Sequence, residues 1–163
     1  MPRFFLPSLI LLMSVYVLPA DAQTTAPSSA AQSTAETPDD AAGVEAAVED
    51  YLLGLYDAAP ERIERSVSRD LVKYGFWRSS PDADYRSSPM NYEQLYALAE
   101  RWNMDNRQGI DEYSLREIVV YDVLDKTAVA KLTADWGIDY FQLEKIEGKW
   151  MIRHVIWQSA PLD

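Results

Sequence analysis

The last part of the chain carries two runs of alternating apolar and polar residues on either side of the dipeptide Glu147-Gly148. Such a turn between alternating runs predicts a β-hairpin, and its position fixes which side chains share a face. The expected cross-strand pairs are Leu143 with Ile152, Phe141 with His154, and Asp139 with Ile156. The single histidine of the chain is therefore expected on an apolar face, diagonal to an aspartate.

Two further strands are expected before this hairpin. Residues 115–123 are rich in valine and isoleucine, and residues 127–136 alternate. Because the connections are short, neighbouring strands should be antiparallel. A tight turn at Trp136-Gly137 would place residues 127–136 beside the hairpin and extend its apolar face. The expected face holds Ala128, Ala130, Leu132, Ala134, Asp139, Phe141, Leu143, Trp150, Ile152, His154 and Ile156. Small alanines beside large aromatic residues indicate a curved sheet with room above it.

Three helices are expected before these strands. Apolar residues recur at three- and four-residue steps between Val44 and Leu55. Pro60 fits the first position of a second, shorter helix, and Asn91 begins a third with a capping-box pattern. Residues 71–77 form either a short strand or the exit of the second helix. The pattern predicts an α+β, cone-shaped fold with three N-terminal helices packed on the concave face of a curved, mostly antiparallel sheet.

The N-terminal residues have the features of a secretory signal peptide. Arg3 precedes an apolar stretch that is shorter than a membrane span of about 20 residues. The tripeptide Ala20-Asp21-Ala22 predicts cleavage after Ala22, and hence a periplasmic or secreted protein. An uncleaved N-terminal anchor is the alternative. With residues 1–22 removed, we expect a flexible tether over 23–40 and a single domain over 41–160.

Composition excludes several classes of function. The chain has no cysteine, so disulfides, thiolate metal sites and a cysteine nucleophile are absent. Its net charge of -11 disfavours binding to nucleic acid or to an anionic membrane surface. A single histidine argues against a transition-metal site, and there is no glycine-rich phosphate loop. We therefore predict no metal and no cofactor. Arg62, Arg65 and Arg69 could hold an anion, but the interleaved Glu61 and Glu64 favour a solvated helix face.

One motif of the closing hairpin is characteristic, and it reads Asp139-Tyr140-x-x-Leu143-x-Lys145-Ile146-x-Gly148-Lys149-Trp150-x-Ile152, followed by Trp157-Gln158. Together with the order of elements, it makes the chain resemble the putative lumazine-binding branch of the nuclear transport factor 2-like superfamily, related to SnoaL-like proteins and of cystatin-like α+β type. The resemblance spans about residues 44–158. The short connection at 136–138 and His154 depart from that family.

The resemblance implies a conical pocket, which the superfamily uses in two ways. Ketosteroid isomerase, scytalone dehydratase, limonene epoxide hydrolase and polyketide cyclases are enzymes, whereas many relatives only bind. Fold alone does not decide between these. The expected ligand-pocket residues are Tyr51, Trp102, Leu132, Phe141, Trp150 and Ile152.

Asp139 and His154 are the one pair suited to catalysis on the expected face. An apolar pocket raises the pKa of a carboxyl group, so such a pair could perform acid-base chemistry as an isomerase, dehydratase or cyclase. A lone histidine on an apolar strand is more often a packing residue. The sequence therefore favours a non-catalytic protein that holds a small apolar or aromatic molecule, with the Asp/His enzyme as the alternative. A structural interaction protein whose cone is filled by its own side chains is a third possibility.

The outer face of the sheet is also expected to be apolar. In the predicted register it exposes Tyr140, Val155 and Trp157. A contiguous apolar patch on an exported protein indicates a partner surface, and relatives with this fold commonly pair through their sheets. We therefore expect a homodimer across this face.

Overall fold

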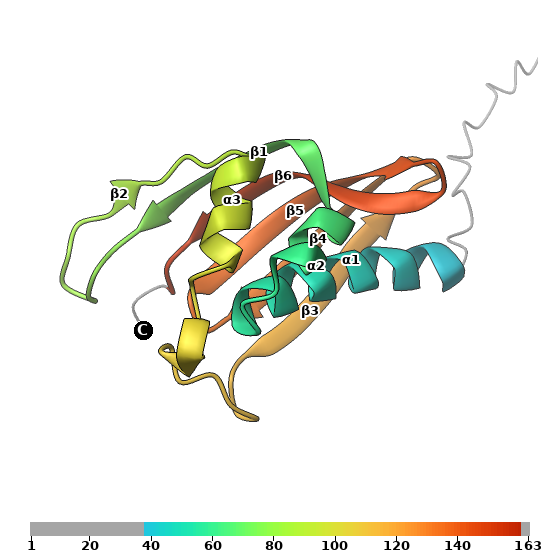
Figure 1. Ribbon diagram of the computed structural model, residues 1–163. Coiled ribbons are helices and arrows are strands. Elements are labelled where there is room, and N and C mark those ends of the chain that lie inside the picture. Colours follow the sequence, from blue (N-terminus) through green and yellow to red (C-terminus); the bar gives the residue numbers. More distant parts are fainter. Residues whose placement is uncertain (1–37, 161–163) are drawn as a thin grey trace, which may run out of the picture. The chain divides into compact units, whose positions relative to one another are not determined.

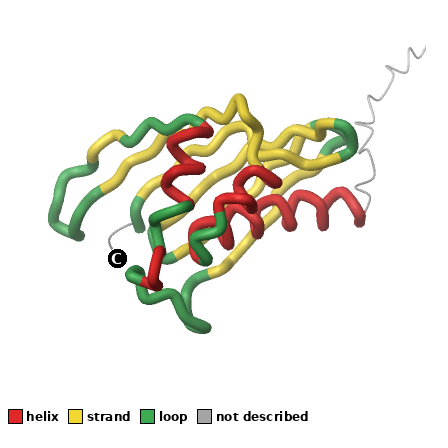
Figure 2. The backbone as a smooth tube through the Cα atoms, in the orientation of Figure 1, coloured by secondary structure: helices red, strands yellow, loops and turns green. Residues whose placement is uncertain are grey.

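The computed structural model describes residues 38–160, in which three α-helices lie over one face of a six-stranded sheet (Figures 1 and 2). In chain order the elements are α1 (Pro38–Tyr56), α2 (Pro60–Ser66), β1 (Val67–Trp77), β2 (Arg86–Ser87), α3 (Tyr92–Ala99), the 3-10 helix η1 (Met104–Asn106), β3 (Arg116–Val123), β4 (Thr127–Ala134), β5 (Gly137–Ile146) and β6 (Lys149–Gln158). The strands lie side by side in the order β2-β1-β6-β5-β4-β3. The predicted fold class is confirmed.

Strand β1 connects the helical part of the chain to the sheet. Strands β3 to β6 form an antiparallel meander, and β1 pairs in parallel with β6, the last strand. The chain passes directly from Ser66 at the end of α2 to Val67 at the start of β1. Residues 71–77 are thus part of a strand, which was one of the two predicted possibilities. This parallel pairing places Lys73 beside Val155.

The helices form where the sequence pattern predicts them. Pro60 is the first residue of α2, where its missing N–H costs nothing. The Asn91 side chain accepts a hydrogen bond from the backbone of Gln94, and the Gln94 side chain accepts one from the backbone of Asn91, so a capping box starts α3. The buried face of α1 consists of Val44, Ala47, Val48, Tyr51, Leu52, Leu55 and Tyr56.

The domain begins slightly earlier than predicted. Helix α1 starts at Pro38, so residues 38–40 belong to a helix and not to the expected tether. The expected signal peptide and the rest of the tether lie outside the described residues. Within residues 38–160, none of the helices combines the length and the apolar character needed to span a membrane.

The turn between β4 and β5 lies one residue before the predicted position. Ala134 pairs with Gly137 and Leu132 pairs with Asp139, so the register differs from the prediction by two residues. A shift of two residues keeps every side chain on its face. The alanines of β4 are therefore buried as predicted: Ala128, Ala130 and Ala134 are each at most 3% exposed.

The predicted register of the last hairpin is right near its turn and wrong beyond it. Leu143 pairs with Ile152 as predicted, but Gln142 then pairs with His154, so Arg153 is an extra residue in β6. This β-bulge shifts the pairing by one residue. Because side chains alternate between the two faces of a sheet, the rest of β6 is reversed relative to the prediction.

The bulge turns four side chains to faces opposite to those predicted. His154 and Ile156 are exposed on the face away from the helices, whereas Val155 is 3% exposed and pairs with Phe141 on the helix side. Trp157 also lies on the helix side, opposite Asp139. The Arg153 side chain stays on the outer face, where it donates a hydrogen bond to the carbonyl oxygen of Asp70.

Candidate functional site

Asp139, which the sequence indicates as a site residue, is fully buried and forms an ion pair with Lys73. The Nζ of Lys73 lies 2.8 Å from Oδ1 of Asp139, and the two side chains are 5% and 0% exposed. Lys73 lies on β1 and Asp139 on β5, so the pair spans the intervening strand β6. Removing two charges from water is costly, so a buried pair needs further hydrogen bonds to persist.

Two additional donors supply those hydrogen bonds. The Tyr51 hydroxyl on α1 donates to Oδ1 of Asp139 over 3.2 Å, and the Trp136 indole N–H donates to Oδ2. Lys73 donates a second hydrogen bond to the Tyr51 hydroxyl oxygen over 2.7 Å. The Asp139 carboxylate thus accepts three hydrogen bonds, which is the pattern that stabilises an ionised carboxylate away from water.

Burial changes the pKa of the two titratable partners of Asp139. It raises the pKa of the Tyr51 hydroxyl well above its ordinary value, and the negative charge of Asp139 adds to this effect. It also lowers the pKa of the Lys73 ammonium, although Asp139 opposes that change. Tyr51 therefore stays protonated and acts as a hydrogen-bond donor over the whole physiological range.

A cavity of about 720 Å³ lies against this network. Tyr51 and Lys73 are among its most deeply buried lining residues, so they form its floor. Loops at 79–81 and 108–110 complete its rim together with Ser159 and Ala160. Four tryptophans line it: Trp77, Trp102, Trp136 and Trp157. A cavity that combines several large aromatic side chains with polar groups able to orient a ligand is typical of a small-molecule site.

The aromatic wall between α1 and the β4–β5 turn is held in place by stacking and hydrogen bonds. Trp102 stacks on Tyr56 with ring centroids 5.9 Å apart, and Trp136 meets both rings edge-on at 5.3 and 5.5 Å. The Tyr56 hydroxyl donates to the carbonyl oxygen of Leu115 and accepts from the backbone N–H of Asp135. These contacts fix the wall before any ligand arrives.

Trp157 forms the wall on the side of β1. Its indole lies over the backbone of Gly75, where a Cβ atom would be 2.0 Å from Nε1. The same ring lies 4.9 Å from the Lys73 ammonium, which is within the range of a cation-π contact. The β6 bulge and the missing side chain at Gly75 together place Trp157 against the floor.

The predicted ligand-pocket residues lie in different parts of the structure, and their role in binding stays a prediction. Tyr51 and Trp102 line the cavity, as expected. Trp150 lies against a separate, smaller hollow near the start of α1. Three further predicted residues are fully buried core side chains that do not line the cavity: Leu132, Phe141 and Ile152.

The predicted pairing of Asp139 with His154 is wrong. The two residues were expected on one face, but the bulge at Arg153 turns His154 to the outer, solvent-exposed face. Asp139 remains on the helix side, where its hydrogen bonds come from other residues. The geometry that acid-base chemistry by this pair requires is not present.

Sequence reasoning missed Lys73, the partner of Asp139. The signal was present: Lys73 is a charged residue within an otherwise apolar run, at a position that alternates with the exposed Val72 and Tyr74. A lysine on the inward face of a strand needs a buried anion, and Asp139 was the inward-facing carboxylate available.

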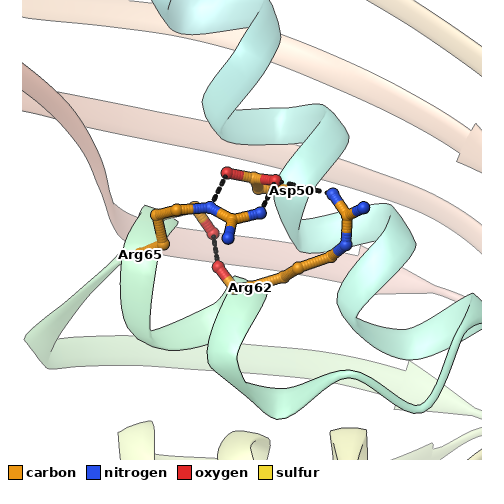
Figure 3. Close-up of polar contacts among 4 residues, drawn as sticks. Asp50, Arg62 and Arg65 are labelled. Carbon is orange, nitrogen blue, oxygen red and sulfur yellow. Dashed lines mark hydrogen bonds and ion pairs between the residues drawn. The ribbon is translucent and has the colours of Figure 1, made fainter.

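The arginines of α2 do not form a free anion site. Figure 3 shows Arg62 and Arg65 both directed at Asp50 of α1. Arg69 lies in β1 and pairs with Glu64. The charges of Arg62 and Arg65 thus hold α2 against α1, and that of Arg69 links β1 to α2, so all three arginines already pair with a carboxylate of the chain. Within residues 38–160, no cluster of three metal-ligating side chains occurs.

Replacing Asp50 with asparagine should lower the Tm by about 3 °C at neutral pH. The hydrogen bond from Arg65 holds the pKa of Asp50 below its ordinary value. The folded state thus binds this proton less tightly than the unfolded chain, so the stabilisation is complete above about pH 4 and is lost as pH falls through the lowered pKa. Thermal unfolding of both proteins at pH 7 and near pH 2.5 measures this.

The control for Asp50→Asn is Glu64→Gln, which removes an exposed carboxylate that also pairs with an arginine. This control should change the Tm less than Asp50→Asn does, because solvent screens the exposed pair. A difference between wild type and Asp50→Asn that is the same at both pH values would contradict the assigned role of Asp50.

A family model described as "Putative lumazine-binding" matches residues 39–158. Among curated proteins, no match to the chain was found. The matched segment contains all six strands, helices α2 and α3, and all of α1 except Pro38. It also contains every residue of the Lys73–Asp139 network.

Solved structures with a similar fold come from several bacteria. An NTF2-like protein of unknown function from Silicibacter pomeroyi DSS-3 is 16% identical with a TM-score of 0.58, covering 76% of this chain and 98% of its own. A ketosteroid isomerase-like protein from Erwinia carotovora atroseptica SCRI1043 is 17% identical with a TM-score of 0.52, covering 76% and 98%. A protein of unknown function with a cystatin-like fold from Nostoc punctiforme PCC 73102 is 14% identical with a TM-score of 0.54, covering 77% and 94%. At these identities the likeness establishes the fold.

Proposed function

The chain belongs to the family described as putative lumazine-binding, and from this premise we propose that it binds a small, largely apolar or aromatic molecule in the tryptophan-lined cavity, without catalysing a reaction. The observation that carries the proposal is the cavity of about 720 Å³ whose lining includes four tryptophans. Flat aromatic walls favour flat ligands, because stacking adds to the gain from burying apolar area.

Binding without reaction is supported by the state of the polar groups. The Asp139 carboxylate is fully engaged by Lys73, Tyr51 and Trp136 and does not line the cavity. A general base must reach the proton that it removes, and Asp139 is screened from the ligand by its own donors. His154 is on the other face of the sheet. In this proposal, Asp139 and its three hydrogen-bond donors shape the site, and His154 takes no part in it.

The proposal is tested by filling the cavity. The double variant Met90→Trp/Leu98→Trp places two larger side chains on its lining. With fluorene as an apolar aromatic probe in equilibrium dialysis, wild type should bind, and the variant should bind at least about tenfold more weakly. Native mass spectrometry of protein purified from its own source should then identify the natural ligand as a retained mass.

The matched control is Tyr113→Trp, because Tyr113 is 84% exposed and does not line the cavity. This control adds a tryptophan without filling the site and should bind fluorene as wild type does. Absence of fluorene binding by wild type, or equal binding by the filled variant, would contradict the proposed function.

We further propose, as the sequence predicts, that two copies of the chain associate through the outer face of the sheet. The structure changes which residues would form the contact. Tyr140 is on that face, but the bulge turns Val155 and Trp157 to the helix side. Tyr74, Ile156 and Tyr140 instead form a row across three adjacent strands, each more than 40% exposed. Val72 and Phe76 extend this apolar patch.

Replacing Ile156 with arginine should convert a dimer to a monomer, because it places a charge at the centre of the patch. Sedimentation velocity at protein concentrations of tens of micromolar measures the change. Tyr113→Arg adds the same charge at an exposed loop position and should leave the dimer intact. A monomeric wild type would end this proposal.

A further inference from the structure

Lys73 has one hydrogen-bond donor more than its neighbours use. Its ammonium group carries three N–H bonds, and two of them are directed at Oδ1 of Asp139 and the hydroxyl oxygen of Tyr51. Among residues 38–160, no side chain or carbonyl accepts the third. The ammonium lies 4.9 Å from the centroid of the Trp157 ring, and Lys73 and Trp157 both line the cavity, whereas Asp139 does not.

We propose that the third N–H of Lys73 donates a hydrogen bond to a neutral carbonyl oxygen of the ligand. The ligand class is then a conjugated ring system that bears a ketone, lactone, lactam or quinone oxygen. This inference rests on the proposed function, since it names the chemistry of the molecule that occupies the same cavity.

The charge of the floor favours a neutral acceptor. Lys73 and Asp139 already cancel, and both are almost fully buried. A carboxylate bound at Lys73 would add a second anion beside Asp139, and the cation between them could compensate only one. A carbonyl oxygen accepts the hydrogen bond without adding charge. Burial, which lowers the pKa of Lys73, also makes its ammonium a stronger donor to such an oxygen.

The other charged side chains on the cavity lining are closer to solvent than Lys73, since Arg78 is partly exposed and Asp135 is exposed. The Arg78 guanidinium donates to the carbonyl oxygens of Pro81 and Ala160 and lies over the Tyr85 ring. Asp135 accepts a hydrogen bond from the backbone N–H of Leu115. Lys73 is therefore the buried charged residue of the lining, where a hydrogen bond to a ligand is not weakened by solvent.

Three probes of the same ring shape separate the possibilities. Fluorene has no oxygen, 9-fluorenone carries a neutral carbonyl, and fluorene-9-carboxylate carries an anion. In equilibrium dialysis against wild-type protein, 9-fluorenone should bind at least about tenfold more tightly than fluorene, because a hydrogen bond from a charged donor is gained. The carboxylate should bind more weakly than the ketone.

The matched variant removes both charges of the floor. Lys73→Met/Asp139→Asn leaves no unpaired buried ion and should bind fluorene and 9-fluorenone about equally. Lys126→Met, at an exposed lysine away from the cavity, should keep the preference for the ketone. Infrared spectroscopy of 9-fluorenone bound to wild-type protein gives a test that does not depend on how well the variant folds. A hydrogen bond from Lys73 should shift the carbonyl stretch of the bound ketone to a lower wavenumber than it has in an apolar solvent.

The outcomes distinguish this inference from the proposed function. If fluorene and 9-fluorenone bind wild type equally, if the carboxylate binds best, or if the carbonyl stretch does not move, the role of Lys73 is overturned while the apolar site stands. A ketone preference that survives in the double variant also overturns it. If none of the three probes binds, the proposed function itself fails.

Discussion

Replacing Lys73 alone with methionine is expected to lower the free energy of unfolding by about 3–5 kcal/mol. Methionine matches the length of the lysine stem but leaves the Asp139 carboxylate, which is 0% exposed, without its cation. The hydrogen bonds from Tyr51 and Trp136 remain, yet neither donor carries a charge. Urea unfolding monitored by tryptophan fluorescence measures the loss.

Two controls assign this loss to the uncompensated ion. Lys126→Met removes the same charge from an exposed position and should change stability by no more than about 0.5 kcal/mol. Lys73→Met/Asp139→Asn removes both ions and should recover much of the stability lost by the single variant, because the ions then no longer need compensation. A single variant as stable as wild type would show that the pair does not form.

Replacing Gly137 with alanine should destabilise the protein by about 3 kcal/mol or more. Gly137 has φ of 138°, and an added Cβ would lie 2.0 Å from the carbonyl oxygen of Gln158 and 2.8 Å from Cα of Ser159. Both neighbours are backbone atoms, so relief requires that the end of β6 move away from β5. Thermal and urea unfolding measure the loss of stability.

Gly148→Ala is the matched control for Gly137→Ala. Gly148 also has a positive φ, of 84°, but no atom lies within 4 Å of the added Cβ. Its cost should be limited to backbone strain, about 1 kcal/mol. An equal cost at the two glycines would mean that the contact with Gln158 is not what requires glycine at 137. Because Trp136 and Ser159 line the cavity, Gly137→Ala should also weaken binding of fluorene, whereas Gly148→Ala should not.

The fold could be predicted from the sequence because its signals are local. Pro60, the capping box at Asn91 and the Glu147-Gly148 turn each act within a few residues, and all three are found where they were expected. The faces of β4 were also predicted correctly, although the turn was misplaced, since a two-residue error preserves the alternation.

The site could not be predicted to the same extent, because it depends on one irregular residue and one distant strand. The alternation of β6 is interrupted by two successive polar residues, Arg153 and His154, but the three apolar residues that follow fit either face, so the sequence alone does not decide the register beyond them. Lys73 reaches Asp139 only because β1 pairs in parallel with β6, and no turn signal links segments so far apart in the chain. Non-local pairings of this kind are set by the complete sheet.

The pairing of β1 with β6 also bears on the stage of folding at which the cavity floor forms. Lys73 and Asp139 are 66 residues apart, and the strand between them is the last one in the chain. Joining distant segments loses more chain entropy than closing a local hairpin, so we expect such contacts to form late in folding. We therefore expect the cavity floor to be complete only after β1 has docked on the meander, so that a partly folded chain with intact hairpins should lack this cavity.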